Sequence, residues 1–394
     1  MSEQIALGFC NNVDYEIVWD SAVLDELVVR YQIEADEPNA RAPIQSERDL
    51  IVSMLGYMKA GEGGERFVAS SAIIEKFAAR FEKKITLGGT SVRAAIAMQK
   101  LGHTAALHLI TQNEQVRRLV PRENPFVCSN ESDTLYPHLI VQFGVGDRVC
   151  AGAIDIRARQ SNRLIYHCNT DRIAMRINPD FADLVSGAQA LLISGFNAMQ
   201  DKRLLADRLA TVSQLLDSLP VAATVFFEDG GYYDPAFRQV IYRALARRIS
   251  VYSMNEDEMQ AHLARKVALQ DAGQARAALA DLRRIIPAET IVLHTGNWAL
   301  AQGEGASRYR SALHAGVTMA TTRFRYGDEF TVANYREIES RPPSDDNRAF
   351  ARAIESTAGG AFCCVPVAEV EQANGTTIGL GDAFVGGFLP ALLT

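Results

Sequence analysis

The sequence predicts an α/β fold in which helices cover a mostly parallel sheet, with a second, smaller lobe made of inserted segments. Short apolar runs rich in β-branched residues alternate with longer stretches of helical period, and two regions interrupt that alternation. A length of 394 residues with 48% hydrophobic content is ample for one large domain with insertions or for two domains.

Seven short apolar runs are predicted to be strands of the large sheet. They are residues 5–9, 104–111, 190–196, 221–228, 249–254, 290–294 and 317–322. Between the third and the fourth, residues 201–219 repeat leucine and valine at the spacing of one helical face. Strand and helix signals that alternate in this way indicate parallel strands with helical crossovers.

The two interrupting regions are predicted to form one lid domain. Residues 15–85 are charged and mostly helical in pattern, whereas residues 136–169 alternate like the strands of a half-exposed hairpin. We therefore divide the chain into a large α/β domain and a discontinuous lid. The large domain takes residues 1–14, 86–135 and 170–394, and the lid takes residues 15–85 and 136–169.

The charges and cysteines narrow the class of protein. The net charge of -7 comes from intermingled acids and bases, without the basic run of a nucleic-acid or lipid-binding surface. The six cysteines lack the paired CxxC spacing of a zinc site or a redox dithiol. No stretch approaches the roughly 18 apolar residues of a membrane span. We expect a cytoplasmic enzyme or binding protein with no nucleic-acid or membrane partner.

The segment GLGD, from Gly379 to Asp382, carries the clearest signal for chemistry. Unpaired N–H groups of a Gly-x-Gly turn at the start of a helix form an anion site together with the helix dipole. There Asp382 can take a proton from a hydroxyl that attacks a phosphoryl group held by those N–H groups. The alternative is that Asp382 only caps the helix. Neither a P-loop nor the GxGxxG fingerprint occurs in the sequence.

Further polar motifs follow the predicted strands, at the sheet edge where ligands bind. In chain order these motifs are NNVD (11–14), GGTSVR (88–93), SNR (161–163), SGFN (194–197), FFED (226–229), NEDE (255–258), HTGN (294–297) and GLGD (379–382). Their order and spacing resemble the ribokinase-like superfamily and, within it, the ADP-dependent glucokinase and phosphofructokinase family. The resemblance covers nearly the whole chain. It implies a three-layer α/β/α nucleotide-binding domain with a smaller lid domain.

The resemblance implies roles for the first and last motifs. Asp382 is the expected catalytic base, and Gly379 and Gly381 form an anion hole that also contacts the nucleotide. Asn12 and Asp14 are expected to hold the acceptor sugar. The residues that hold the sugar and the base that takes its proton would then come from opposite ends of the chain.

Four further residues are expected to bind the acceptor. Gly88 and Gly89 let a ligand approach the backbone, and Arg93 offers a cation for a sugar phosphate where the family helix usually begins GGN or GGQ followed by small residues. Arg163, in the lid, is expected to hold a sugar phosphate on closure. The alternatives are that Arg93 lies on the solvent face of its helix and that Arg163 is a solvated strand residue.

Metal binding is implied for residues after the central strands. Asn255 and Glu258 match the family's NxxE motif, whose carboxylate orders water around Mg²⁺. Glu228 matches the glutamate of a histidine and glutamate pair two residues apart, but Phe226 replaces the histidine. That change removes a partner that would orient the carboxylate, so a surface acid at a strand end is the alternative for Glu228.

The function implied is an ADP-dependent sugar kinase that uses Mg²⁺. It would transfer the β-phosphoryl group of ADP to a hexose or hexose phosphate, with fructose 6-phosphate favoured over glucose through the arginines, and release AMP. Asn197 and His294 are expected to contact the nucleotide, the alternatives being a loop hydrogen-bonding residue and a core histidine. An ATP-dependent sugar or nucleoside kinase and an inactive ligand-sensing homologue are the alternative functions. A monomer or homodimer is expected.

Overall fold

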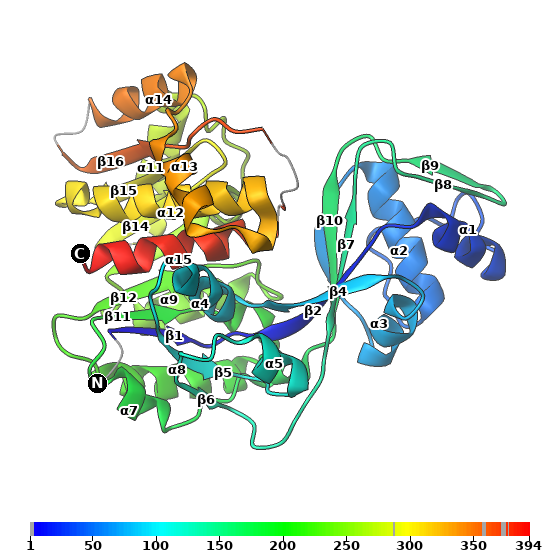
Figure 1. The fold of residues 1–394 in the computed structure, drawn as a ribbon, viewed down its shortest axis with the longest axis horizontal. Coiled ribbons are helices and arrows are strands. Elements are labelled where there is room, and N and C mark those ends of the chain that lie inside the picture. Colours follow the sequence, from blue (N-terminus) through cyan, green and yellow to red (C-terminus); the bar gives the residue numbers. More distant parts are fainter. Residues whose placement is uncertain (1–3, 287, 357–359, 372–375, 377) are drawn as a thin grey trace.

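Two lobes linked by extended strands make up the computed structural model of the chain (Figure 1). The structure describes residues 4–286, 288–356, 360–371, 376 and 378–394. Within these residues, the larger lobe is built on a nine-stranded sheet and the smaller lobe on a five-stranded sheet. No described helix is long and apolar enough to cross a membrane.

The large sheet is parallel over most of its width. In spatial order its strands are β16 (Phe362–Pro366), β15 (Trp298–Gly303), β14 (Thr290–His294), β13 (Val251–Asn255), β12 (Thr224–Glu228), β11 (Ala190–Ile193), β1 (Ile5–Gly8), β5 (Ala106–Leu109) and β6 (Phe126–Cys128). All neighbours from β14 to β6 pair in parallel, whereas β15 and β16 are antiparallel. The carboxyl ends of the parallel strands therefore meet at one edge.

Helices cover both faces of this sheet and make three layers. One face carries α4 (Thr90–Lys100), α5 (Glu114–Leu119), α12 (Arg310–Tyr326) and α15 (Leu380–Leu392). The other carries α7 (Phe181–Val185), α8 (Lys202–Asp217), α9 (Ala236–Leu245), α10 (Glu256–Leu263), α11 (Ala272–Ile285) and α14 (Asp345–Glu355). Alternate strand residues supply the two cores, since Phe226 packs in one and Phe227 in the other. The α/β prediction is confirmed.

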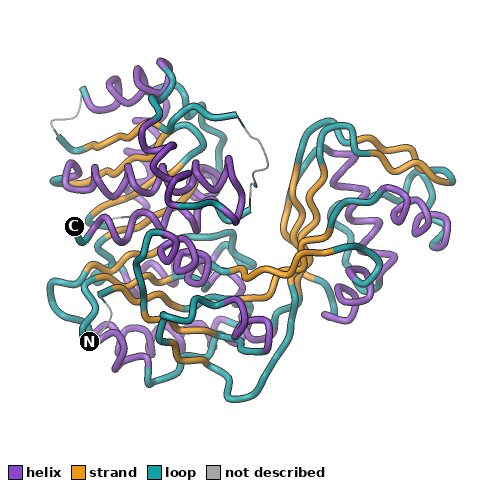
Figure 2. Tube along the Cα trace, viewed as in Figure 1, coloured by secondary structure: helices purple, strands orange, loops and turns teal. Residues whose placement is uncertain are grey.

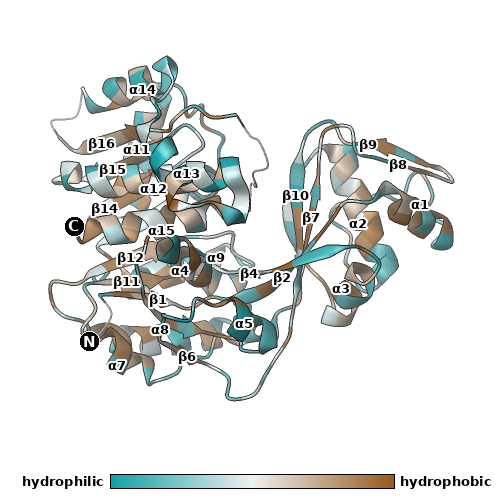
Figure 3. Ribbon diagram, in the orientation of Figure 1, coloured by the Kyte–Doolittle hydropathy of each residue, from teal (hydrophilic) through white to brown (hydrophobic). Residues whose placement is uncertain are grey.

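The smaller lobe is a sheet with helices on one face only (Figure 2). Its strands in spatial order are β3 (Gly64–Phe67), β10 (Asn162–His167), β7 (His138–Phe143), β2 (Asn12–Ile17) and β4 (Lys83–Gly88). Helices α1 (Ser21–Arg30), α2 (Glu47–Ala60) and α3 (Ser71–Ala78) and the hairpin β8 (Arg148–Ala151) and β9 (Ile154–Arg157) complete it. Leu139 and Val141 pack into this core, whereas Ile140 lies on the opposite face. Figure 3 shows α2 largely hydrophobic and β10 largely hydrophilic.

Strands β2 and β4 belong to the lid sheet and also lead into the large lobe. β2 begins at Asn12 and β4 ends at Gly88, and these two residues are paired in the antiparallel register. The predicted domain boundaries, after residue 14 and after residue 85, fall inside these strands. We keep the division into a large domain and a lid with those boundaries as a proposal.

The strand predicted at residues 317–322 is wrong, because those residues lie inside helix α12. The run is apolar and rich in β-branched residues, but α12 is buried on several sides, including Val317, Thr318, Met319 and Thr322. A buried helix of this kind has no polar stripe to reveal its period, so a short apolar run reads as a strand. The strands β15 and β16 were not predicted.

Two glycines let helices α12 and α15 approach closely. A Cβ atom on Gly316 would meet Phe384 Cε2 at 2.6 Å, and a Cβ atom on Gly387 would meet the backbone carbon of Ala315 at 2.8 Å. A side chain at the second position would press on backbone that cannot move aside. These glycines therefore fix how α15, which carries Asp382, sits against its neighbour.

We expect Gly387→Ala to destabilise the protein by roughly 1–3 kcal/mol, because the added methyl group overpacks the contact between the helices. Chemical unfolding of the purified proteins is the measurement. Gly231→Ala is the matched control, since a Cβ atom there meets nothing within 4 Å. Equal stability of the two variants would contradict the close helix contact.

Candidate active site

All the site residues predicted from the sequence line one cavity of about 1340 Å³. They are Asn12, Asp14, Gly88, Gly89, Arg93, Arg163, Asn197, Glu228, Asn255, Glu258, His294, Gly379, Gly381 and Asp382. They come from the carboxyl ends of strands in the large sheet, from the starts of helices such as α4, α10 and α15, and from the lid strands. The fold thus brings together residues from across the chain, although their individual roles stay predictions.

The GLGD turn opens helix α15. Gly379 is the N-cap residue and has φ 64°, a left-handed conformation that favours glycine. Asp382 is the third residue of the helix, so it lies in the first turn and is not the N-cap residue. Its side chain is 22% exposed, and its nearest cation is Arg93, with Nε 3.9 Å from Oδ2.

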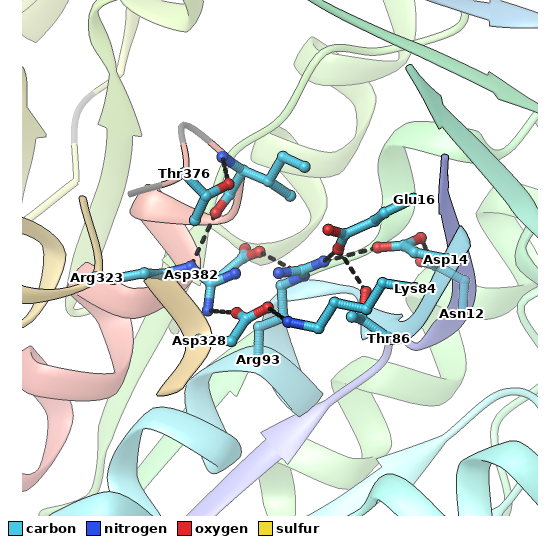
Figure 4. Close-up of polar contacts among 11 residues, drawn as sticks. Asn12, Asp14, Glu16, Lys84, Thr86, Arg93, Arg323, Asp328, Thr376 and Asp382 are labelled. Carbon is cyan, nitrogen blue, oxygen red and sulfur yellow. Dashed lines mark hydrogen bonds and ion pairs between the residues drawn. The ribbon is translucent and has the colours of Figure 1, made fainter. Parts of the chain in front are cut away.

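Arg93 is buried among carboxylates (Figure 4). Its Nη2 lies 2.8 Å from Asp14 Oδ2 and 3.4 Å from Glu16 Oε1, and its side chain is 5% exposed. The alternative of a solvent-facing arginine is therefore wrong. Because the guanidinium already contacts Asp14, Glu16 and Asp382, its predicted grip on a sugar phosphate would have to compete with three carboxylates.

Asp14 is held from two sides on strand β2. Asn12 Nδ2 donates a hydrogen bond to Oδ1, and Arg93 donates to Oδ2. Burial raises the pKa of Asp14 to about 6, although Arg93 acts in the opposite direction. A Cβ atom on Gly88 would come within 2.5 Å of Asp14 Oδ2, so this glycine makes room for the carboxylate. Gly89, at φ 93°, makes room for the backbone at Cys10.

The lid contributes Arg163, and a second arginine was missed. Arg163 lies on β10 among the residues that face the cavity. Arg172, on α6 (Thr170–Ala174), also lines the cavity and is buried. Its Nη2 donates to Asn197 Oδ1 at 2.9 Å, and its Nε has no partner among the described residues. Arg172 stands in a polar stretch of sequence, and no local pattern distinguishes it from a surface residue.

The sequence has no histidine two residues before Glu228 of β12, but His294 of β14 contacts this glutamate in the folded chain. His294 Nε2 lies 3.0 Å from Glu228 Oε1, and the imidazole stacks on Phe384 with ring centroids 4.7 Å apart. Phe226 packs in the core against Phe388 instead. Glu228 is 7% exposed, so the alternative of a surface acid is wrong. A Cβ atom on Gly381 would meet His294 Cε1 at 3.2 Å, which places this pair beside the GLGD turn.

Asn255 and Glu258 form a capping box at the start of α10. Asn255 Oδ1 accepts from the N–H of Glu258 at 3.0 Å, and Glu258 Oε2 accepts from the N–H of Asn255 at 2.9 Å. Burial and the nearby Asp229 raise the pKa of Glu258 well above its usual range. Asp229 was also missed, and its Oδ2 lies 2.7 Å from His262 Nε2. In the described part of the chain, no three His, Cys, Asp or Glu side chains are grouped to bind a metal directly.

A family model described as the ADP-specific phosphofructokinase/glucokinase conserved region matches residues 3–389. The chain belongs to the ADP-specific phosphofructokinase/glucokinase family. Like the sugar kinases of this family, it is a phosphotransferase with an alcohol group as acceptor. The resemblance inferred from the motifs is confirmed. A comparison with curated proteins finds no match.

Solved structures of this family share the fold. A phosphofructokinase from Pyrococcus horikoshii OT3, crystallised with AMP, has 15% identity and a TM-score of 0.77 over 100% of this chain and 98% of that one. An ADP-dependent kinase in complex with fructose 6-phosphate and ADPβS has 14% identity and a TM-score of 0.74 over 99% and 94% of the two chains. At such low identity these structures show the fold, with its three layers and its lid.

The raised pKa of Asp14 makes the stability of this family member depend on pH. The pKa of Asp14 rises from an ordinary value of 3.8 to about 6 in the folded chain, so Asp14 binds its proton more tightly when the chain is folded. Its contribution to stability is present at low pH and is lost as the pH rises through about 6. Between about pH 4 and about pH 6, the unfolding free energy should fall by about 2 kcal/mol more in the wild type than in Asp14→Asn.

Urea unfolding at the two pH values is the measurement, and Asp36→Asn, which removes an exposed aspartate, is the control. The control should keep the pH dependence of the wild type. A wild type and an Asp14→Asn protein with the same pH dependence would show that the pKa of Asp14 is not raised.

Proposed function

We propose that the chain transfers the β-phosphoryl group of ADP to a hydroxyl of a hexose or hexose phosphate, prefers fructose 6-phosphate to glucose, and releases AMP. The observation that carries the proposal is the position of Asp382 in the same cavity as Asp14, with Arg93 in contact with both. The ligands bound in the structural relatives, AMP in one and fructose 6-phosphate with ADPβS in another, support the same pair of substrates.

In the proposed reaction, Asp382 accepts the proton of the acceptor hydroxyl while the oxygen of that hydroxyl attacks the β-phosphorus of ADP. The bond from that phosphorus to the oxygen that bridges to the α-phosphate breaks, and AMP leaves with the bridging oxygen. The N–H groups of Gly379 and Gly381 and the dipole of α15 stabilise the negative charge on the transferring group. Asn12 and Asp14 orient the sugar, because a carboxylate accepts hydrogen bonds from hydroxyls.

The residues beyond β12 and β13 suit Mg²⁺. Glu228 Oε2 is buried with no partner among the described residues, and burial together with Asp229 and Glu228 raises the pKa of Glu258, an effect that a nearby cation would offset. Oxygen donors are what this ion prefers. We assign Glu228, Asn255 and Glu258 to hold it through water, with Asn255 fixing Glu258 in its capping box. When bound, Mg²⁺ would neutralise charge on the nucleotide phosphates.

The preference for a phosphorylated sugar rests on the arginines of the lid side. Arg163 and Arg172 both line the cavity, and the buried Nε of Arg172 has no partner among the described residues. Glu65 lines the cavity on the same side as these arginines, but its Oε1 lies 2.9 Å from His167 Nε2. Guanidinium groups bind phosphate through several hydrogen bonds at once, which a neutral sugar does not offer. Asn197 keeps Arg172 in place and is assigned, with His294, to the nucleotide side.

The first test of this proposal is AMP release from ADP with glucose, fructose 6-phosphate or a sugar panel as acceptor. In Asp382→Asn we expect kcat to fall by about 10²- to 10⁴-fold with little change in the KM for ADP, because only the general base is removed. Asp183→Asn, at an exposed position on α7, is the control and should keep full activity. Turnover with ATP but not with ADP would contradict the donor assignment.

A second test addresses the acceptor. In Arg172→Gln the KM for fructose 6-phosphate should rise by about 10- to 100-fold, because hydrogen bonds to a charged group are lost. The KM for glucose, if it is turned over, should stay constant. Arg176→Gln, which changes an exposed arginine just after the end of α6, is the control. Equal effects of Arg172→Gln on both acceptors would rule out a phosphate-binding role.

A further inference from the structure

A buried arginine outside the cavity lining contacts the backbone next to the GLGD turn. Arg323, on α12, donates from Nε to the carbonyl oxygen of Ile378 at 2.9 Å (Figure 4). Ile378 immediately precedes Gly379, so the bonded carbonyl belongs to the peptide unit that also carries the Gly379 N–H group. Nothing in the proposed reaction so far uses Arg323.

The planarity of the peptide bond gives this contact a consequence. In a trans peptide the C=O and N–H bonds point in opposite directions. A carbonyl oxygen held toward Arg323 therefore turns the Gly379 N–H group away from it. Arg323 is 6% exposed, and its hydrogen bond is shielded from water. The direction of the Gly379 N–H group thus depends on a residue that does not line the cavity.

Two further charges connect Arg323 to the lid. Its Nη1 lies 2.6 Å from Asp328 Oδ1, in the turn η3 (Gly327–Glu329) that follows α12. The other oxygen of Asp328 lies 2.8 Å from Lys84 Nζ. Lys84 belongs to lid strand β4, where it pairs with Glu16 of β2. The contacts run from the lid sheet through Asp328 and Arg323 to the turn before helix α15.

The position of Lys84 on β4 makes its ion pair with Asp328 sensitive to the orientation of the lid. Gly88, at the other end of β4, lies beside Asp14 in the cavity, and Lys84 is about 13 Å farther along an extended strand. A rotation of the lid about the end of β4 therefore displaces Lys84 more than Gly88. The Lys84 side chain is 51% exposed, so the pair with Asp328 adds little stability and is free to break and re-form.

We propose that Arg323 is a positioning residue that fixes the direction of the Gly379 N–H group, and that the Lys84 and Asp328 ion pair links this position to the orientation of the lid. The inference rests on the proposed function, because the direction of this N–H group matters for turnover only if the turn is an anion hole. With the lid in the orientation of this structure, the Gly379 N–H group is then expected to point toward the transferring phosphoryl group.

The kinetic test separates this role from plain stability. Arg323→Met should lower kcat about tenfold or more while the KM for ADP and acceptor stays constant, since the donor acts on the transferring group. Arg323→Lys, which keeps a donor near the carbonyl, should recover part of that loss. A merely structural arginine would change the melting temperature and the fraction of active sites, but not kcat per folded site. Unchanged kcat in Arg323→Met would overturn the proposal.

The link to the lid is tested by a double-mutant cycle. Lys84→Gln and Asp328→Asn should each lower kcat about threefold, and the double variant no further, because residues in one chain of contacts are not additive. Lys83→Gln, at the neighbouring position of the same strand, is the matched control and should keep the wild-type kcat. Additive losses, or an equal loss in Lys83→Gln, would overturn the link.

Hydrogen exchange keeps the inference testable if the proposed function fails. A wild-type protein without turnover on any acceptor would contradict the kinase proposal alone. Backbone amides of residues 378–381 should still exchange faster in Lys84→Gln than in the wild type, because the contact that fixes their turn is weakened. The same exchange in both proteins would overturn the inference whether or not the enzyme is active.

Discussion

The buried guanidinium of Arg93 holds together parts of the site that come from distant parts of the chain. A buried charge is tolerated only when it is well paired, and Arg93 finds its partners in Asp14 and Glu16 of β2 and in Asp382 of α15. Strand β2, helix α4 and helix α15 are thereby constrained relative to one another. Asp14 and Asp382, the carboxylates that we propose as acceptor ligand and base, consequently both contact one cation.

Close backbone contacts, as well as the ion pairs of Arg93, connect the lid with the large sheet. Gly88 and Gly89 allow β4 to pass close to the side chains of Asn12 and Asp14 and to the backbone at Cys10 before helix α4 begins. The part of the cavity that holds Asn12 and Asp14 is thus built where the lid strands enter the large lobe. A lid that moves about this point changes the far end of the cavity while the residues near Asp14 stay together.

Much of the fold follows from the sequence because strand and helix signals are local. The lining of the cavity could be predicted where residues end a strand, as with Glu228, Asn255 and His294, since parallel strands deliver their ends to one edge. Burial of Arg93 was not decided by the sequence, because its partner Asp14 is 79 residues away. Burial of Arg172 was likewise not decided by the sequence, because its partner Asn197 lies in a different element. The pairing of His294 with Glu228 was missed because the motif places the histidine on the strand of the glutamate, whereas β14 supplies it here.

The place of β1 in the sheet bears on how the chain reaches this structure. The first strand lies in the middle, between β11 and β5, and Ile5 pairs with Ala190. Contacts between residues so distant in sequence form slowly, because a long loop must close before any pairing is gained. Until β1 inserts, two central strands present open edges on which another chain can pair. The central strand that leads into β2 with Asn12 and Asp14 is therefore also the point at which refolding competes with aggregation.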